Sequence, residues 1–375
     1  MKICHLTSAH KSSDIRIFEK ECVSLAKKRE NQVFLIAKGK SFKRKNVNII
    51  GIGLEDIGRI KRMLKVTKKI YKTALKVDAD IYHIHDPELL LYALKLKRRG
   101  KKVIFDSHEY YSSQILHKEY IPGILRIIIS KLYKFYETHV VKNIDGVIFP
   151  CKIDGRHPFQ GIGKEIEYID NVPLLEEVKA KKGKKIEDFK EKALLCTVGG
   201  LTYNRGIKHI IEAALDADVK IILAGNFSPE AFKKEIMELP AYRSVDYRGY
   251  CNREEVNKIY DEATIGVSNI LNLGQYPQIE NLPTKVYEYM MNGMPFIISN
   301  FKYAKEVADK YKCGIAVEPA NISELSNAIK RLRVDAKLAF SMGENGRKAV
   351  LEKFNWGIEE EKLYKFYDKI LSNKI

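Results

Sequence analysis

The segment Leu194-Leu-Cys-Thr-Val-Gly-Gly-Leu-Thr-Tyr-Asn-Arg-Gly206 indicates the fold class, because an apolar strand pattern runs into a glycine-rich turn that precedes a helix. Such a turn directs backbone N–H groups toward an anion at the start of the helix, and Arg205 adds a guanidinium suited to phosphate. A plain connection between a strand and a helix accounts for the same residues, so this segment alone leaves both interpretations open.

The same alternation of strand and helix runs through the whole chain and predicts two doubly wound α/β domains in tandem. Ligands of such sheets bind beyond the carboxyl ends of the strands, so we expect a site in a cleft between the domains. The highly charged segment 176–192 reads as an interdomain linker or an exposed helix. Strands are expected at 2–7, 32–37, 80–85, 102–106, 146–150, 194–198, 219–224, 246–247, 265–268, 296–299 and 314–317, and helices near 14–29, 57–77, 87–98, 124–142, 322–352 and 357–371.

Composition fits this two-domain prediction. The chain has 375 residues, of which 45% are hydrophobic and 30% charged, which excludes disordered and low-complexity classes. Its most apolar stretch, 124–133, is interrupted by Arg126 and Lys131, so no membrane span is expected. Six scattered cysteines fit neither a disulfide framework nor a zinc site, and Met1-Lys2 leads directly into a strand, so we expect a cytoplasmic, reduced protein.

The positive charge is concentrated in the first half of the chain. Residues 1–170 contain 34 basic and 19 acidic residues, whereas 171–375 contain 32 and 29. This asymmetry indicates an anionic partner of the first half, either nucleic acid or an anionic membrane surface, although a generally lysine-rich solvated surface is the alternative. The sequence contains no RNA-recognition or helix-turn-helix motif.

The helical pattern at 124–142 carries a broad apolar stripe with Arg126, Lys131 and Lys134 opposite. A helix lying on a membrane surface has this pattern, and so does a helix packed on a core. Taken alone, the sequence favours packing on the core.

Histidines follow two of the expected strands. His83 and His85 share one face of a strand, but no matching ligand set stands at a suggestive spacing, so we expect no metal site there. Asp86-Pro87 reads as a helix start with Asp86 as its N-cap. His85 and His108 stand at the carboxyl ends of their strands, on the side of the sheet where ligands bind. Each histidine could have a structural or a functional role there.

The richest segment is Glu280-Asn-Leu-Pro-Thr-Lys-Val-Tyr-Glu288-Tyr-Met-Met-Asn-Gly-Met-Pro295. Pro283 suits the first position of a helix that ends near Gly293, which puts Glu288 in its second turn. Lys285 in the first turn opposes the helix dipole, and this indicates a bound anion at the helix start.

Several of these segments together resemble one family. Glu280 and Glu288 form the E-x7-E pattern of retaining glycosyltransferases, and the sequence around them looks like the donor-site helix of glycosyltransferase family 4. The turn 198–206 resembles the phosphate loop of that family's donor domain. Further segments, similar to members that build surface polysaccharides, are 5–10, 14–21, 83–90 and 105–109, and 354–356 resembles the point where the last helix crosses back to the first domain.

The resemblance covers essentially the whole chain and implies a GT-B fold, with two Rossmann-like doubly wound domains facing across a cleft. Residues 1–170 with 356–375 would bind the acceptor, and residues 176–355 would bind the nucleotide sugar. By the same resemblance the catalytic residues would be Glu280, His108, Arg205 and Lys285. Glu288 would bind the ribose, Gly199, Gly200, Tyr250, Asn281, Leu282 and Thr284 would complete the donor site, and His10, Asp14 and Arg16 would bind the acceptor.

The family resemblance also implies the chemistry. Arg205 and Lys285 would hold the diphosphate, with retention of anomeric configuration and neither a metal nor a cofactor besides the UDP- or GDP-sugar substrate. One departure is Gly200, where many members carry arginine. We expect a saccharide acceptor, lipid-linked, in surface polysaccharide biosynthesis at the inner face of the cell membrane, and no nucleic acid partner.

Other functions compete with glycosyl transfer. A GT-B epimerase or phosphorylase would need active-site acids or a cofactor-binding lysine for which the sequence has no clear signature. A basic protein that binds membranes or nucleic acid would show salt-dependent binding and no response to nucleotide sugars. An inactive transferase-like partner subunit is the third alternative, although Glu280 and Glu288 are both retained.

Overall fold

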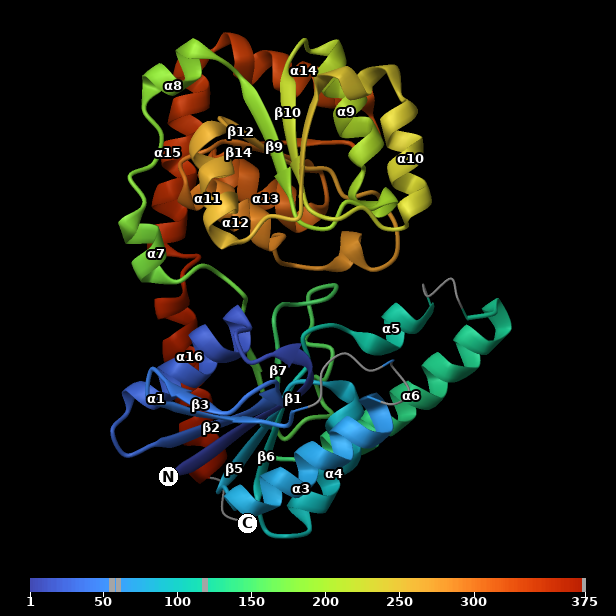
Figure 1. Ribbon diagram of the computed structural model, residues 1–375, viewed down its shortest axis with the longest axis vertical. Coiled ribbons are helices and arrows are strands. Elements are labelled where there is room, and N and C mark those ends of the chain that lie inside the picture. The colour runs from blue at the N-terminus through green and yellow to red at the C-terminus, as the bar shows by residue number, and fades with distance from the viewer. Residues whose placement is uncertain (54–57, 59–61, 117–120, 373–375) are drawn as a thin grey trace. The chain divides into compact units, whose positions relative to one another are not determined.

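The computed structural model describes residues 1–53, 58, 62–116 and 121–372 (Figure 1). The chain divides into two compact units, Met1–Asn171 with Gly357–Ile375, and Val172–Trp356. Each unit contains a sheet of mostly parallel strands connected by helices, which is the α/β class that the alternation predicts. Among the described residues, no helix combines the length and the apolar character that crossing a membrane requires.

The first unit is built on an eight-stranded sheet with the order β3-β4-β2-β1-β5-β6-β7-β8. Neighbouring strands are parallel except β3 and β4, which form an antiparallel hairpin. The direction of winding reverses between β1 and β5, and a doubly wound sheet binds ligands beyond the carboxyl ends at such a point. The strands are β1 (Lys2–Lys11), β2 (Gln32–Lys38), β3 (Phe42–Arg44), β4 (Val47–Gly51), β5 (Ile81–Ile84), β6 (Lys102–Asp106), β7 (Gly146–Phe149) and β8 (Glu165–Tyr168).

Helices connect these strands, and the last helix of the chain returns to this unit. The first connection is a π-helix, η1, whose N-cap Asp14 accepts a hydrogen bond from the Ile17 N–H. The predicted helix start at 57 lies outside the described residues. The helices are η1 (Ile15–Cys22), α1 (Val23–Lys27), η2 (Arg62–Val66), α3 (Thr67–Val77), η3 (Pro87–Leu89), α4 (Leu90–Lys97), α5 (Tyr111–Leu116), α6 (Gly123–Asn143) and α16 (Trp356–Ser372).

The second unit has a six-stranded parallel sheet with the order β11-β10-β9-β12-β13-β14. Counted along the chain within this unit, that is the order 3-2-1-4-5-6 of the Rossmann fold, and the winding reverses between β9 and β12. The strands are β9 (Leu194–Val198), β10 (Lys220–Ala224), β11 (Val245–Gly249), β12 (Ile265–Ser268), β13 (Phe296–Ser299) and β14 (Gly314–Val317). The helices are α7 (Leu175–Ala180), α8 (Ile186–Glu191), η4 (Tyr203–Arg205), α9 (Ile207–Asp216), α10 (Glu230–Glu238), η5 (Pro240–Ser244), α11 (Arg253–Glu262), η6 (Tyr276–Gln278), α12 (Thr284–Met291), α13 (Lys302–Tyr311), α14 (Ile322–Val334) and α15 (Ala336–Glu352).

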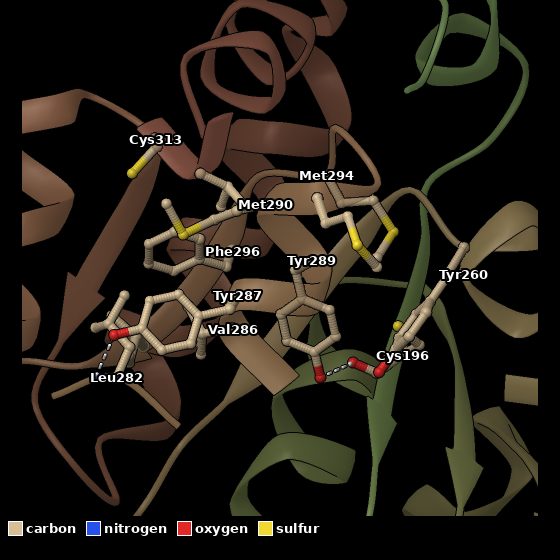
Figure 2. Packing of buried hydrophobic residues seen from close by; sticks show 14 of the residues in the cluster. Cys196, Tyr260, Leu282, Val286, Tyr287, Tyr289, Met290, Met294, Phe296 and Cys313 are labelled. Carbon is tan, nitrogen blue, oxygen red and sulfur yellow. Dashed lines mark hydrogen bonds between the residues drawn. The ribbon is translucent and has the colours of Figure 1, made fainter. Parts of the chain in front are cut away.

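Two apolar clusters cover the two faces of this second sheet. Cys196 and Phe296 lie in one cluster with Tyr289 and other residues of α12 (Figure 2). Leu195 and Ile297, their neighbours along the strands, lie in the other cluster with residues of α9 and α14. Successive strand residues point to opposite faces, so strands that are apolar throughout require helices on both sides.

Some elements differ from the sequence prediction. Strands β3, β4 and β8 and helix α5 were not predicted. The apolar patterns of β3 and β8 are weak, because β3 is exposed along its length and β8 is half-buried throughout. The charged segment 176–192 forms α7 and α8 within the second unit, and each buries one apolar side chain, Val178 and Phe189. The helical stretch 322–352 is two helices, because Asp335 caps α15 by accepting a hydrogen bond from the Leu338 N–H.

The expectation that 124–142 packs on the core is wrong for most of the stripe. Helix α6 buries Ser130, Glu137, Val140 and Val141, whereas its large apolar residues face outward. Figure 1 shows the N-terminal part of α6 extending beyond the sheet of the first unit. The outward-facing residues are Ile124, Leu125, Ile127, Ile128, Ile129, Leu132 and Phe135, each at least 40% exposed.

Tyr289 couples α12 to the second sheet, and Gly266 makes room for its ring. An alanine Cβ at position 266 would lie 2.2 Å from that ring. The Tyr289 hydroxyl lies 3.3 Å from the Cys196 carbonyl oxygen and 3.2 Å from the Val267 carbonyl oxygen. Gly266→Ala should therefore destabilise the second unit by about 1–3 kcal/mol through overpacking.

Urea unfolding would measure this change. The control is Gly123→Ala, because nothing lies within 4 Å of a Cβ at that position and its substitution should cost almost nothing. Equal unfolding midpoints for the two variants would contradict the close packing of Tyr289 on Gly266.

Candidate functional site

The turn after β9 has the tight backbone that the sequence suggests. Gly199 has a φ of +112°, and its carbonyl oxygen lies 1.8 Å from the position that a Cβ of Gly225 would occupy. Only glycine therefore fits at position 225, where the ends of β9 and β10 come together. The turn leads through η4 to Gly206, whose φ of +62° starts α9.

Lys285 joins this turn to the start of α12. Its ammonium lies 3.2 Å from the Thr197 hydroxyl, and its end would be 3.9 Å from a Cβ at Gly199. Burial, together with the positive charge of Arg205, lowers the pKa of Lys285 to about 7. Two mutually repelling cations beside a glycine turn form a favourable position for an anion.

Arg205 stands at the end of η4, half-buried, with its guanidinium carbon 5.9 Å from the centroid of the Tyr276 ring. Gly199 and Gly200 are exposed in the same turn. The fold therefore brings four of the sequence-predicted residues together, namely Gly199, Gly200, Arg205 and Lys285, from elements separated by about one quarter of the chain.

Glu288 lies one helical turn beyond Lys285 and already has two partners. Arg253 donates a hydrogen bond to one of its carboxylate oxygens, and the Tyr260 hydroxyl donates to the other at 2.5 Å. Tyr260 also belongs to the apolar cluster in Figure 2, so the carboxylate is held by a side chain that is itself fixed. The charge of Glu288 raises the pKa of Arg253 although burial opposes this.

Arg253 and Tyr260 were not predicted from the sequence. One signal existed: Arg253 opens α11, where the helix dipole disfavours a cation, as it does for Lys285 in α12. Nothing in the sequence indicates that Tyr260 faces Glu288, because the two residues are joined only by the packing of α11 against α12.

The other predicted donor residues lie around α12 and β11. Pro283 is the N-cap of α12 rather than its first residue. Before it, Glu280 and Asn281 are half-buried, and Leu282 is buried with its N–H 3.5 Å from the Tyr287 hydroxyl. Thr284 is exposed, and Tyr250 follows β11 with 76% of its side chain exposed.

In the first unit, His10, Asp14 and His108 form a polar group near the carboxyl ends of β1 and β6. The His10 ring contacts the His108 ring edge-on at 5.2 Å, and His10 Nδ1 lies 3.0 Å from Asp14 Oδ2. The hydrogen bond that His10 donates to the Asp14 carboxylate raises the pKa of His10. Although burial opposes it, the same bond lowers the pKa of Asp14.

Arg16 does not share this exposed position. Its side chain is 6% exposed and donates to both carboxylate oxygens of Asp106, at 3.0 and 2.9 Å, and to the Ile169 carbonyl at 3.0 Å. Asp106 in turn lies 3.0 Å from His108 Nε2. Arg16 is therefore placed to orient His108 through Asp106, and its burial does not favour direct contact with an acceptor.

Asp86 occupies the N-cap position of η3, but its carboxylate does not cap that helix. Its Oδ2 atom instead accepts hydrogen bonds from the Thr7 hydroxyl at 2.8 Å and from the N–H groups of Ser8 and Ala9 at 2.6 and 3.1 Å. Asp86 thus holds the carboxyl end of β1, from which His10 projects.

Two groups of described residues have ligand atoms close enough for a metal ion. In the first group, of His85, Asp106 and His108, both carboxylate oxygens of Asp106 already accept hydrogen bonds from the Arg16 guanidinium, which leaves this carboxylate less free to bind a metal. The second group is His5, Glu21, His83 and His85, all fully buried in the first unit.

The second unit has a Rossmann-ordered sheet with a glycine turn beside two cations, an arrangement typical of domains that bind phosphorylated ligands. Family comparison agrees with this class. The model described as "Glycosyl transferases group 1" matches residues 178–349, and the model "Glycosyltransferase Family 4" matches residues 21–169. The chain belongs to the group 1 glycosyltransferases, with a first domain of glycosyltransferase family 4.

Two curated relatives are uncharacterized glycosyltransferases of Methanocaldococcus jannaschii. One is 23% identical over 196 residues, which is 51% of this chain and 48% of the relative. The other is 24% identical over 216 residues, which is 56% of this chain and 52% of the relative. The chain thus spans about half the length of the curated relatives it matches.

Solved structures resemble the chain over its whole length. Sucrose-phosphate synthase of Thermosynechococcus elongatus has a TM-score of 0.75 at 15% identity, with both chains covered completely. A glycosyltransferase of Rickettsia africae has a TM-score of 0.72 at 18% identity, with 100% of this chain and 99% of that one covered. HepE of Anabaena, solved with UDP and glucose, has a TM-score of 0.69 at 14% identity, with 98% and 99% covered. These likenesses establish the GT-B fold with its two Rossmann-like domains.

The lowered pKa of Lys285 gives a test of the anion site. In the unfolded chain a lysine keeps its proton up to about pH 10.4, so between pH 7 and that value the unfolded state binds more protons than the folded state. The stability of the unliganded protein should therefore rise with pH from 7 to 9, by at most about 1.4 kcal/mol per pH unit from this group.

Lys285→Met removes this contribution, so the variant should have a higher free energy of unfolding than the wild type at pH 7. That difference should become smaller between pH 7 and pH 9. Lys208→Met, at a 38% exposed position of α9, controls for the loss of one charge. Denaturant unfolding at several pH values gives the comparison, and an advantage independent of pH would contradict the assignment.

Proposed function

We propose that the protein transfers a sugar from a nucleotide-sugar donor to a saccharide acceptor. The observation that carries this proposal is the pairing of Lys285 with Arg205 at the glycine turn and the start of α12, one helical turn from Glu288. HepE, a structural neighbour, was solved with UDP-glucose, which supports a UDP-sugar as donor. A GDP-sugar is the second choice.

The chemistry follows from where charge develops. Breaking the bond between the sugar and the diphosphate leaves negative charge on the phosphate oxygens and positive charge on the sugar ring. Lys285, Arg205 and the N–H groups at the start of α12 would stabilise the leaving diphosphate, because they are fixed before the reaction begins. With Gly200 in place of a second arginine, Lys285 would carry more of that stabilisation than in members with arginine there.

The two glutamates would have different tasks. Glu288, held between Arg253 and Tyr260, would accept hydrogen bonds from the ribose hydroxyls, and its fixed orientation lowers the entropic cost of binding. Glu280, in the loop before α12, would contact the transferred sugar. Asn281, Leu282 and Thr284 would complete this loop's contacts, and Tyr250 would lie beside the base.

We further propose that transfer retains the anomeric configuration and needs no metal at the diphosphate and no resident cofactor. Cationic side chains would stabilise the negative charge of the diphosphate, as a divalent ion does in enzymes that use one. The polar group of His10, Asp14 and His108 would bind the acceptor, with Arg16 acting on His108 only through Asp106. The acceptor we propose is a lipid-linked saccharide of surface polysaccharide biosynthesis.

Association with the inner face of the cell membrane is the last part of the proposal. The outward-facing apolar residues of α6 lie on the same helix as the exposed Lys131 and Lys134, within the half of the chain that carries most of the positive charge. An amphipathic helix with basic residues binds an anionic lipid surface through both features. Such binding would bring a lipid-linked acceptor to the first domain.

The donor proposal is tested by thermal denaturation against UDP-, GDP-, ADP-, CMP- and dTDP-sugars. A ligand at about 100 times its dissociation constant adds about 2.7 kcal/mol of stability, so one nucleotide family should raise the melting temperature selectively. Glu288→Ala should bind that sugar nucleotide at least about tenfold more weakly, the effect of losing about 1.4 kcal/mol. Glu280→Ala should bind it normally and transfer slowly.

Glu235→Ala is the matched control, because this acid is 53% exposed on α10 of the same unit. It should behave as the wild type in both assays. If no nucleotide sugar shifts the melting temperature of the wild type, the transferase proposal fails in favour of an inactive partner subunit or a binding protein.

The membrane proposal is tested by sedimentation with vesicles. At physiological salt the wild type should sediment with vesicles containing anionic lipid and not with neutral ones. Leu132→Glu with Phe135→Glu, at positions 63% and 76% exposed, should lower that binding at least about tenfold without changing the melting temperature.

Val334→Glu is the control, because Val334 is 80% exposed on α14 of the second unit. Its binding should equal that of the wild type. If the α6 substitutions change the oligomeric state and leave vesicle binding intact, α6 is a contact between copies of the chain and the membrane proposal is wrong.

A further inference from the structure

Four side chains that can bind metal meet inside the first unit. His5 lies on β1 directly beside His83 on β5, His85 follows on the same face of β5, and Glu21 projects from η1. All four residues are 0% exposed. No element of the proposed transfer chemistry uses His5, Glu21 or His83.

The distances are regular. Glu21 Oε2 lies 3.9 Å from His5 Nδ1, 3.8 Å from His83 Nε2 and 3.9 Å from His85 Nε2. His5 Nδ1 and His85 Nε2 are 2.9 Å apart. One carboxylate oxygen is thus nearly equidistant from three ring nitrogens, at separations too long for hydrogen bonds.

The group also leaves polar atoms without partners. Glu21 Oε2, His83 Nε2 and His5 Nε2 are buried and make no hydrogen bond, whereas Glu21 Oε1 lies 3.2 Å from the Arg16 guanidinium. An unpaired buried polar atom costs about 1–3 kcal/mol, and native proteins contain few of them. Glu21 Oε2 and His83 Nε2 lie 3.8 Å apart, so one partner placed between them would satisfy both.

Protons or a cation could satisfy these atoms, and the spacing distinguishes the two. A shared proton draws nitrogen and oxygen to about 2.7–3.0 Å. Ligands placed tetrahedrally around zinc, at about 2.0–2.1 Å from the ion, lie about 3.4 Å from one another. The separations of 3.8–3.9 Å from Glu21 Oε2 lie above the hydrogen-bond range, whereas His5 Nδ1 and His85 Nε2, at 2.9 Å, share a hydrogen bond that a metal ion would replace. All four ligand atoms lie within 4.8 Å of one another.

We propose that His5 Nδ1, Glu21 Oε2, His83 Nε2 and His85 Nε2 bind a divalent transition-metal ion, zinc above all. Imidazole nitrogens with one carboxylate form a ligand set that suits zinc. This site is distinct from the diphosphate position in the second unit, so it does not depend on the proposed transfer reaction.

The surroundings match those of a metal site. His83 donates or accepts through Nδ1 with the Tyr367 hydroxyl at 2.8 Å, and His85 Nδ1 lies 3.3 Å from Asp106 Oδ2. Partners of this kind on the outer ring nitrogen fix the orientation of ligating histidines. The Arg16 guanidinium, 3.2 Å from Glu21 Oε1, holds the other oxygen of that carboxylate.

The site would be structural. Four protein ligands leave no open position for a substrate, and full burial keeps water away. The ion would tie β1, β5 and η1 together directly behind the carboxyl ends of β1 and β6, where His10 and His108 stand. It would thereby fix the acceptor side without contacting the acceptor.

Metal analysis of the purified protein tests the proposal. Cells grown with zinc should yield protein carrying about one zinc per chain after dialysis, and cells grown with cobalt should yield protein with the visible absorption of four-coordinate Co²⁺. Glu21→Gln and His83→Gln should each lower the bound metal to well below half an equivalent. His139→Gln, at an exposed position on α6, should leave it unchanged.

The cobalt spectrum keeps the test valid if a variant fails to fold, because it is measured on the wild type. Wild-type protein that carries no stoichiometric zinc or cobalt overturns the proposal. Bound metal without the four-coordinate spectrum, or unchanged by Glu21→Gln in a folded variant, overturns it as well. Neither result would bear on the nucleotide-sugar assays.

Discussion

Parallel strands end at one edge of their sheet, and this constraint organises both domains. In the second domain it places the turn after β9 beside the start of α12, although the two are 88 residues apart at Thr197 and Lys285. In the first domain it brings His10, at the end of β1, to His108, after β6. The reversal of strand order in each sheet spreads the neighbouring loops apart, so polar groups gather at these two points.

The two domains balance charge in different ways at these points. The second domain keeps two cations side by side, and burial together with the charge of Arg205 lowers the pKa of Lys285. The first domain pairs its buried charges internally, because Arg16 neutralises Asp106 and Asp106 orients His108. The cationic position in the second domain would suit a charged donor. The polar hydrogen-bonding groups in the first domain would suit a neutral saccharide.

Two features of the structure do not follow from the common edge at which parallel strands end. Helix α6 exposes apolar side chains that a core would bury, so the stripe that reads as a packing surface in sequence is an external one. The buried group of His5, Glu21, His83 and His85 does the opposite, since it places ligand-type side chains where apolar residues would pack. Each feature carries an energetic cost in isolation, and a lipid surface and a metal ion are the partners that would offset it.

The sequence by itself determined the α/β class and the strands of the second sheet, because strand periodicity, glycine turns and helix-start signals are local. The same local signals single out Glu280, Lys285 and Glu288 as candidate site residues. The sequence missed β3 and β8, whose exposed or half-buried residues carry little pattern, and also the short strand β4, although Val47 and Ile49 are buried there. Only the tertiary structure decided that Arg253 and Tyr260 hold Glu288, that Arg16 is buried on Asp106, and that His5 and Glu21 join His83 and His85. These pairs are set by which strands and helices become neighbours, and that choice depends on the burial of the whole chain rather than on the spacing of any segment.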